Sequence, residues 1–179
     1  APLPFEITLY QAVTKGKTMD LIIQKATELG AHRVVPVLSE RSVPDWDEAK
    51  AAAKVEKWRS VCIESIKQCG SAWQPTLEMP MTPSAAIEDA RGAEVSLIAT
   101  LQSDAKHPRT HIDGYEAENG QAPKKLAIWV GPEGDYTPAE INQIRGSALP
   151  ITLGPLVLRS ETAAIYCLAF LNYELQSRP

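Results

Sequence analysis

Along this chain of 179 residues, segments whose apolar positions are typical of strands alternate with segments whose apolar positions recur at helical spacing. Strand-like runs, some alternating and some continuously apolar, lie at 5–12, 34–38, 95–101, 126–131 and 151–153. Apolar residues at helical spacing lie at 18–29, 49–69, 84–91, 137–148 and 160–176. Strands that alternate with helices predict an α/β domain with a mainly parallel sheet flanked by helices.

The boundaries of several predicted helices are marked by residues that favour a start or a stop. Gly30 and Gly70 follow the helices at 18–29 and 49–69, and glycine commonly ends a helix. Thr137-Pro138-Ala139-Glu140 combines a capping hydroxyl, a proline for the first turn and a glutamate that can return the capping bond. These signals predict a helix that begins directly after the 126–131 strand and its turn.

Two segments depart from the simple alternation. Residues 102–125 are polar and rich in proline, glycine and charge, so we expect a mobile loop at the rim of the site. The last helix, 160–176, is apolar almost all the way round, with Glu161 and Glu174 as its only charges. Because a helix that is apolar on every side must be covered on every side, we expect a homodimer formed through this helix.

Composition narrows the class of protein. The formal net charge of −4 lacks the basic excess of a stand-alone nucleic-acid binder. No apolar run reaches the roughly 20 residues of a membrane helix, and the first residues show no basic region leading an apolar one. Of the three cysteines, Cys62 and Cys69 are expected to face the core as reduced thiols. We therefore expect a cytoplasmic protein without a membrane partner.

Two glycine-containing turns carry the candidate chemistry. Gly131-Pro132-Glu133-Gly134 follows a buried strand, and Leu153-Gly154-Pro155-Leu156-Val157-Leu158 follows the next one. Turns at the carboxyl edge of a parallel sheet form ligand crevices, and apolar residues beside a glycine suit an adenine-like ring. Arg159 and Glu161 stand at the start of the last helix, beside this crevice.

Each of these signals also has a plainer interpretation. The first turn is compatible with an ordinary strand-to-helix connection. The spacing of Arg159 and Glu161 is compatible with a weak surface ion pair between the two side chains. No dinucleotide fingerprint or phosphate loop is present, and the three scattered histidines indicate no metal site. Charged or polar residues that could face RNA or orient a substrate, but that equally suit a solvated surface, are Lys15, Lys17, Glu28, Arg33, Arg41, Glu64 and Gln68.

Taken together, the motifs resemble the ribosomal RNA small-subunit methyltransferase E family, in the same order and over almost the whole chain. The matching segments are Lys15–Asp20, Gln24–Gly30, Ser39–Ser42, Lys57–Arg59, Glu64 with Gln68–Gly70, Gly131–Gly134 and Leu158–Ala163. The resemblance makes 1–179 one methyltransferase domain of the SPOUT class. It implies a deep trefoil knot at the C-terminal end, a homodimer, S-adenosylmethionine as cofactor, and 16S ribosomal RNA of the small subunit as partner, methylated at uridine N3.

The resemblance also assigns residues. Those implied for the cofactor are Thr100, Leu101, Gln102, Gly131, Pro132, Glu133, Gly134, Leu153, Gly154, Leu156, Val157, Leu158 and Thr162. We expect Arg159 and Glu161 to act in catalysis, with Glu161 either as the base or as the group that orients Arg159. Lys17, Arg41 and Gln68 are the candidates that would face RNA.

The sequence departs from the family pattern in three respects. The usual N-terminal PUA-like RNA-binding barrel is absent from this sequence, which fits either an excised catalytic domain or a shortened relative. The glycine that usually follows Gly-Pro-Glu-Gly is Asp135, with Tyr136 after it, and Ser71 replaces an arginine that often faces RNA. Two alternatives therefore stay open, namely a catalytically inactive rRNA-binding module and a methyltransferase acting on another RNA.

Overall fold

The computed structural model describes residues 3–42 and 45–178 and contains one six-stranded sheet in which every strand pair is parallel. The strands are β1 (Glu6–Ala12), β2 (Arg33–Val37), β3 (Thr76–Leu77), β4 (Val95–Ala99), β5 (Lys125–Val130) and β6 (Leu149–Ile151). Their order across the sheet is β3-β2-β1-β5-β4-β6. This confirms the α/β class and the parallel sheet predicted from the sequence.

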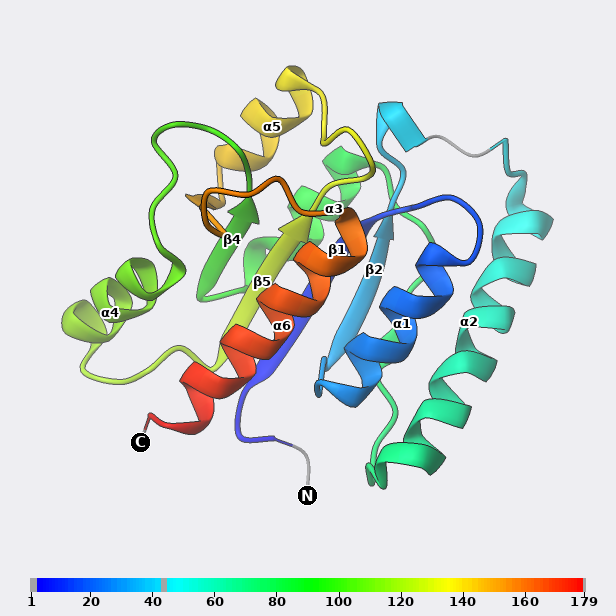
Figure 1. The fold of residues 1–179 in the computed structure, drawn as a ribbon, viewed down its shortest axis with the longest axis horizontal. Helices are drawn as coiled ribbons and strands as arrows, with labels where there is room; N and C mark the ends of the chain where they lie inside the picture. The colour runs from blue at the N-terminus through cyan, green and yellow to red at the C-terminus, as the bar shows by residue number, and fades with distance from the viewer. Residues whose placement is uncertain (1–2, 43–44, 179) are drawn as a thin grey trace.

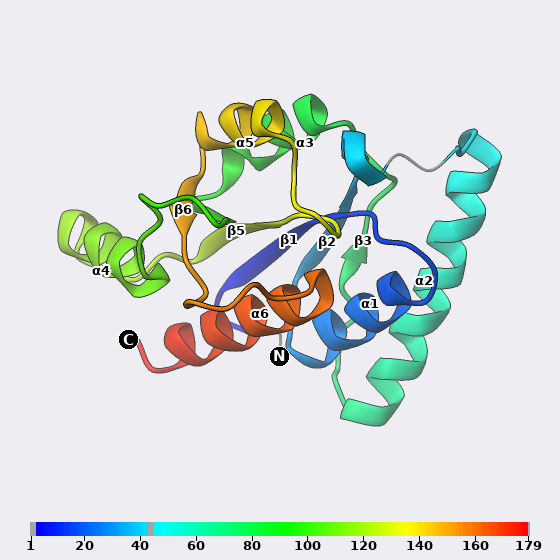
Figure 2. The ribbon, with the colours of Figure 1, turned by 45° about the horizontal axis from the view of Figure 1, so that its top comes forward.

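Helices cover both faces of the sheet (Figures 1 and 2). They are α1 (Thr18–Glu28), α2 (Glu48–Cys69), α3 (Pro83–Asp89), α4 (Pro108–Asn119), α5 (Pro138–Arg145) and α6 (Ser160–Gln176), with short 3-10 turns at Glu40–Ser42 and Ala90–Gly92. In Figure 2, α1 and α6 lie on one face with α2 beside α1, and α3 and α5 lie on the other. The chain is therefore a three-layer sandwich of helices, sheet and helices.

The sheet separates two apolar cores, as its continuously apolar strands require. One core joins alternate residues of β1 and β5, such as Leu9 and Ile128, to α1, α2 and α6. The other joins Tyr10 and Trp129 to α3 and α5, and these two rings stack with centroids 4.3 Å apart. Because the apolar residues of each strand are buried in these cores, they determine where the strand ends and where the following turn begins.

Helix starts agree with the capping signals in the sequence. The Thr137 side chain accepts from the Glu140 N–H at 3.2 Å, and the Glu140 carboxylate accepts from the Thr137 N–H at 2.9 Å. Asp47 caps α2 in a similar way, and Gly70 ends that helix in the left-handed conformation with φ 69°. The reciprocal cap fixes the direction in which the chain leaves the Gly-Pro-Glu-Gly turn.

The prediction of a mobile loop over 102–125 is wrong, because α4 occupies Pro108–Asn119. Its start carries His107 as cap and Pro108 in the first turn, and Gly120 ends it at φ 73°. Only Pro108 and Ile112 of this helix are buried, so its apolar pattern is too sparse to show a helical period. The loop at the rim of the site is confined to the residues between β4 and α4.

Other corrections are smaller. Cys69 is exposed rather than in the core, because the buried face of α2 ends at Ser65, whereas Cys62 and Cys167 are buried. The last strand is Leu149–Ile151 rather than 151–153, and α5 ends at Arg145. β3, which contains only Thr76 and Leu77, is too short to have been predicted from a pattern.

Candidate functional site

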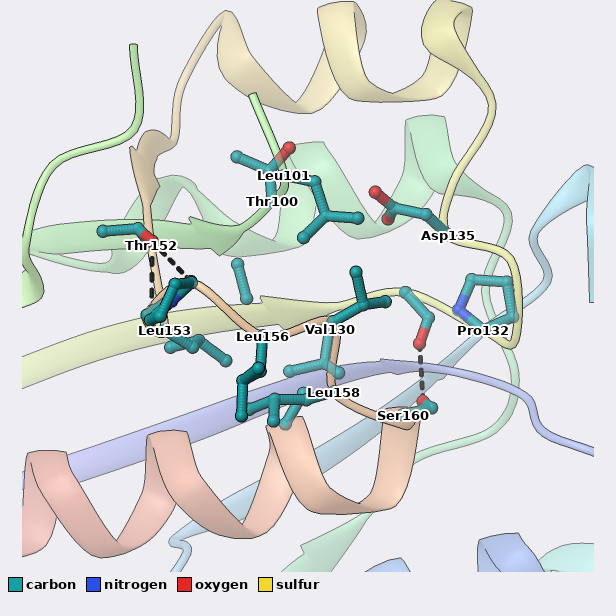
Figure 3. Close-up of a pocket in the computed structure, with 16 residues that line it drawn as sticks. Thr100, Leu101, Val130, Pro132, Asp135, Thr152, Leu153, Leu156, Leu158 and Ser160 are labelled. Carbon is teal, nitrogen blue, oxygen red and sulfur yellow. Dashed lines mark hydrogen bonds between the residues drawn. The ribbon is translucent and has the colours of Figure 1, made fainter. Parts of the chain in front are cut away.

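A cavity of about 250 Å³ opens at the carboxyl ends of β4, β5 and β6, where the turns after these strands meet. Figure 3 shows the residues around it. Its lining consists of Ala99, Thr100, Leu101, Val130, Gly131, Pro132, Asp135, Thr152, Leu153, Gly154, Pro155, Leu156, Val157, Leu158, Ser160 and Ala163. The sheet edge thus carries a crevice where such folds bind ligands.

A chain of buried hydrogen bonds holds two sides of the cavity together. The Ser160 hydroxyl donates to the Gly131 carbonyl oxygen at 2.6 Å, and the Gln11 amide donates to the Ser160 hydroxyl oxygen at 3.0 Å (Figure 3 shows the first). Gln11 lies on β1 and is fully buried. These two hydrogen bonds therefore fix the start of α6 to β1 and to the turn after β5.

The Gly-Pro-Glu-Gly turn is tightly packed where it enters the cavity. A Cβ on Gly131 would lie 2.7 Å from Asp135 Oδ1 and 3.1 Å from the Tyr136 backbone nitrogen, so only glycine fits without movement of the turn. The buried Tyr136 hydroxyl donates to the Val130 carbonyl oxygen at 3.1 Å, and burial raises its pKa well above the usual range. These contacts fix the turn in one conformation.

The segment between β6 and α6 forms the opposite wall. Gly154 adopts φ 109°, and its N–H donates to the Thr152 hydroxyl oxygen at 3.2 Å (Figure 3). Leu156 and Val157 are 72% and 79% exposed. Within the described chain, the peptide groups of 156–158 have no hydrogen-bond partner. Apolar side chains beside free peptide groups can bind a flat heteroaromatic ring on its faces and its polar edge.

The structure brings most of the predicted cofactor residues to this cavity. Those that line it are Thr100, Leu101, Gly131, Pro132, Leu153, Gly154, Leu156, Val157 and Leu158. Gln102, Glu133, Gly134 and Thr162 are neighbours in sequence, but they are exposed and do not line the cavity. Asp135, Thr152 and Ser160 line it and were not predicted, although Asp135 was visible as a departure from the family pattern.

Arg159 and Glu161 flank the cavity at the start of α6. Arg159 is exposed and holds the N-cap position with extended backbone, while its neighbours Leu158 and Ser160 line the cavity. Glu161 is half-buried in the first helical turn. Among the described residues neither side chain forms an ion pair, so the simple surface pair considered from the sequence is not seen. The exposed Arg159 side chain therefore has no ion-pair partner in the part of the chain that the structure describes.

Arg41 is the one candidate RNA-facing residue that approaches the site. Its guanidinium donates to the carbonyl oxygens of Gly134 and, at 3.4 Å, of Asp135. The buried Glu140 carboxylate accepts from the Ser39 hydroxyl at 3.0 Å and from the Glu40 N–H at 2.7 Å. This carboxylate therefore joins the turn that bears Arg41 to α5.

The other polar candidates lie elsewhere. Lys17 is exposed at the start of α1, and Gln68 is exposed near the end of α2 beside a separate hollow. Glu28 pairs with Lys25 at 2.8 Å on the surface of α1, and Arg33 pairs with Asp89 and Glu78. The structure does not bring these residues to the cavity.

The described residues contain neither a metal-type cluster nor a membrane-spanning helix. No group of three or more histidine, cysteine or acidic side chains is arranged to hold a metal ion in this part of the chain. None of the helices in the same residues combines the length and the apolarity needed to cross a membrane. The cavity at the sheet edge is the candidate site because most of the predicted cofactor residues line it.

Comparisons with known proteins agree with this geometry. The sequence model of a family described as RNA methyltransferase domain matches residues 1–172. A Bacillus subtilis (strain 168) protein named ribosomal RNA small subunit methyltransferase E is 30% identical over 97% of this chain and 68% of its own length. The protein of that name from Synechocystis is 30% identical, and this chain spans only 55% of it.

Solved structures give the same result. A methyltransferase from Legionella pneumophila in complex with the bound cofactor SAM superposes with a TM-score of 0.85 at 34% identity, covering 96% of this chain and 67% of that one. A ribosomal RNA small subunit methyltransferase E from Neisseria gonorrhoeae, bound to S-adenosyl methionine, has a TM-score of 0.80 at 28% identity, with 96% and 67% covered. The chain belongs to the RNA methyltransferase domain family and, within it, to the ribosomal RNA small subunit methyltransferase E family.

Proposed function

We propose that this chain is an S-adenosylmethionine-dependent methyltransferase that acts on N3 of a uridine in 16S ribosomal RNA. The observation that carries the proposal is the cavity at the carboxyl edge of the sheet, with Arg159 exposed at its rim. Family membership supports the same reaction class, because related structures were solved with this cofactor. The names of the relatives support 16S rRNA as the substrate.

The residues of the cavity fit the cofactor. Leu101, Leu156 and Leu158 offer apolar surface for an adenine ring, and the free peptide groups of 156–158 offer hydrogen bonds to its edge. The Thr100 hydroxyl, which accepts from the Gln102 N–H, keeps its own proton for a hydrogen bond to the ribose or the amino acid end. When bound, the cofactor supplies a methyl group already activated on a positively charged sulfur.

The protein then has two tasks, which are alignment and charge stabilisation. Uridine N3 carries a proton and lies on the pairing edge of the base, so the nucleotide must be unpaired or flipped out to react. As that proton leaves, negative charge develops on the uracil ring, and we assign its stabilisation to the guanidinium of Arg159, which is exposed at the N-cap of α6. Glu161, two residues further along, is the candidate base for the proton.

Binding of the cofactor at the predicted wall is tested by changing Gly154 to valine. Gly154 has φ 109°, where a β-branched residue is strained, so we expect the wall to shift and saturable binding of S-adenosylmethionine to be lost. Isothermal titration calorimetry on the parent and variant chains measures this effect.

The matched control is Gly120→Val. Gly120 also has positive φ, at 73°, and open space around its Cβ, but it ends α4 away from the cavity. The control should lose a similar amount of stability and keep its affinity for the cofactor. Equal affinity in all three chains would remove the support for this site, and no binding by the parent would overturn the proposed function.

We also propose that the chain forms a homodimer through α6 and that its C-terminal end is knotted. Thr162, Tyr166, Ala169 and Tyr173 form an exposed face along α6, with Tyr166 46% and Tyr173 73% exposed. Aromatic side chains in such a row suit an interface between two copies. The knot is supported by the path of 152–159, which leaves the edge strand β6 and returns to the middle of the sheet, where Ser160 bonds Gly131.

Changing Tyr166 to arginine is expected to convert the dimer to a monomer, because it buries a charge without a partner at the centre of the interface. Size-exclusion chromatography with light scattering measures the mass directly. Ile63→Arg is the control, since Ile63 is 44% exposed but lies on α2. A parent chain that is monomeric at micromolar concentration would contradict the proposal.

A further inference from the structure

Asp135 is the one residue of the cavity whose backbone conformation and chemistry both call for an explanation. Its φ is 67°, and it is the only non-glycine residue with positive φ in the described chain. Glycine adopts that conformation without strain. An aspartate here keeps a backbone conformation that glycine would adopt more easily, and its side chain lines the cavity.

The carboxylate lies at the inner wall of the cavity. Oδ1 accepts a hydrogen bond from the Tyr136 N–H at 2.7 Å, which fixes the side chain against its own turn. Figure 3 shows the carboxylate extending from the turn toward Leu101. Oδ2 accepts no hydrogen bond from any described residue, and Arg41 contacts the Asp135 carbonyl oxygen rather than the carboxylate. One carboxylate oxygen is therefore available to a ligand.

Asp135 is also the only ionisable side chain among the residues that line the cavity. The others are apolar, glycine or hydroxyl-bearing. Burial raises the pKa of the Asp135 carboxyl above its ordinary value, while the Tyr136 N–H and the charge of Arg41 act in the opposite direction. A half-buried negative charge in such surroundings is stabilised by a positively charged ligand.

We propose that Asp135 makes the cavity selective for a positively charged ligand, so that it binds S-adenosylmethionine more tightly than S-adenosylhomocysteine. This inference rests on the proposed function and adds the specificity of its cofactor site. The two molecules share their adenosine and amino acid groups, and differ in that the first has a methyl sulfonium and the second a neutral thioether. Asp135 is the one ionisable side chain of the lining, and our proposal is that the ligand sulfur lies on its side of the cavity. Because the ammonium groups of the two molecules are the same, the carboxylate then distinguishes them through the charge on sulfur.

The selectivity has a consequence for turnover. The reaction product S-adenosylhomocysteine fits the same cavity. A cavity without a charged side chain would bind the product and the cofactor with similar affinity. Asp135 attracts the charged ligand and not the neutral sulfur, so it favours exchange of product for cofactor. The strained φ is compatible with this role because aspartate tolerates the left-handed region better than most residues.

The test is isothermal titration of both ligands into the parent chain, Asp135→Asn and Asp135→Gly. We expect the parent to bind S-adenosylmethionine about tenfold more tightly than S-adenosylhomocysteine, as expected for one partly screened charge pair. In both variants the ratio of the two dissociation constants should approach one, through weaker binding of S-adenosylmethionine alone. The glycine variant removes the strain as well and should melt at a higher temperature than the parent.

Asp104→Asn is the matched control, since Asp104 is an exposed carboxylate paired with Arg145 outside the cavity. Its ratio should equal that of the parent. A ratio that stays unchanged in both Asp135 variants would overturn the inference while the proposed function stands. Loss of affinity for both ligands by the same factor would also overturn it, because the carboxylate would then only shape the turn. A parent that binds neither ligand overturns the proposed function and this inference together.

Discussion

Replacing Arg159 with alanine is expected to lower the rate of methyl transfer by about 10²–10³-fold, while the affinity for S-adenosylmethionine stays nearly constant. The reason is the position of Arg159, which is exposed at the N-cap of α6 and flanked by two cavity-lining residues. In the proposed reaction, a positive charge there would stabilise the uracil anion that develops in the transition state, and Arg159 itself does not line the cavity. Transfer of a labelled methyl group to small ribosomal subunits, with the product nucleoside identified by mass spectrometry, measures the rate.

Two further variants make this result specific. Arg159→Lys keeps the positive charge without the planar guanidinium, so it should recover part of the rate. Arg91→Ala removes another exposed arginine, which pairs with Glu88 of α3 and does not line the cavity, and this change should leave the rate unchanged. If Arg159→Ala methylates as fast as the parent, the charge that stabilises the uracil comes from another residue.

Replacing Trp129 with alanine is expected to reduce the free energy of unfolding by about 3–5 kcal/mol. Trp129 is fully buried near the carboxyl end of β5, stacks on Tyr10, and donates from Nε1 to the Ser96 hydroxyl at 3.1 Å. Alanine would leave a cavity between the sheet and its helices and would remove the stacking partner. Urea unfolding followed by circular dichroism measures the change.

Trp129→Phe and Trp73→Ala complete this experiment. Phenylalanine keeps most of the apolar contact and should lose much less stability than alanine. Trp73 is only half-buried in the loop after α2, so truncating it should have a smaller effect than truncating Trp129. A loss below about 1 kcal/mol for Trp129→Ala would show that the core between the sheet, α3 and α5 repacks freely, contrary to the close stacking seen here.

The sequence was sufficient where a local pattern determines the structure. The continuously apolar strands β4 and β5, and the glycine turns after β5 and β6, lie where their patterns predict them, and the turns meet in one cavity. The reciprocal cap of Thr137 and Glu140 is likewise readable from four neighbouring residues. In each case the residues that determine the structure are close in the chain.

The sequence was insufficient where the determining contacts are distant. The hydrogen bond from Gln11 to Ser160 joins residues of the first strand and the last helix, and no spacing rule shows it. α4 escaped prediction because it buries only two residues. Asp135 was noticed only as an unusual residue, since its place in the cavity depends on three separate turns.

The strand order also has a consequence for synthesis of the protein. β1 occupies the middle of the sheet, with β2 on one side and β5 on the other, and Glu6 pairs with Lys125. While the ribosome is still making the central part of the chain, one edge of β1 has no partner, and an open strand edge of apolar residues readily joins another chain. Binding of a chaperone to β1 during translation would protect that edge until β5 emerges, and folding should be slow, as expected for a sheet built from long-range parallel pairs.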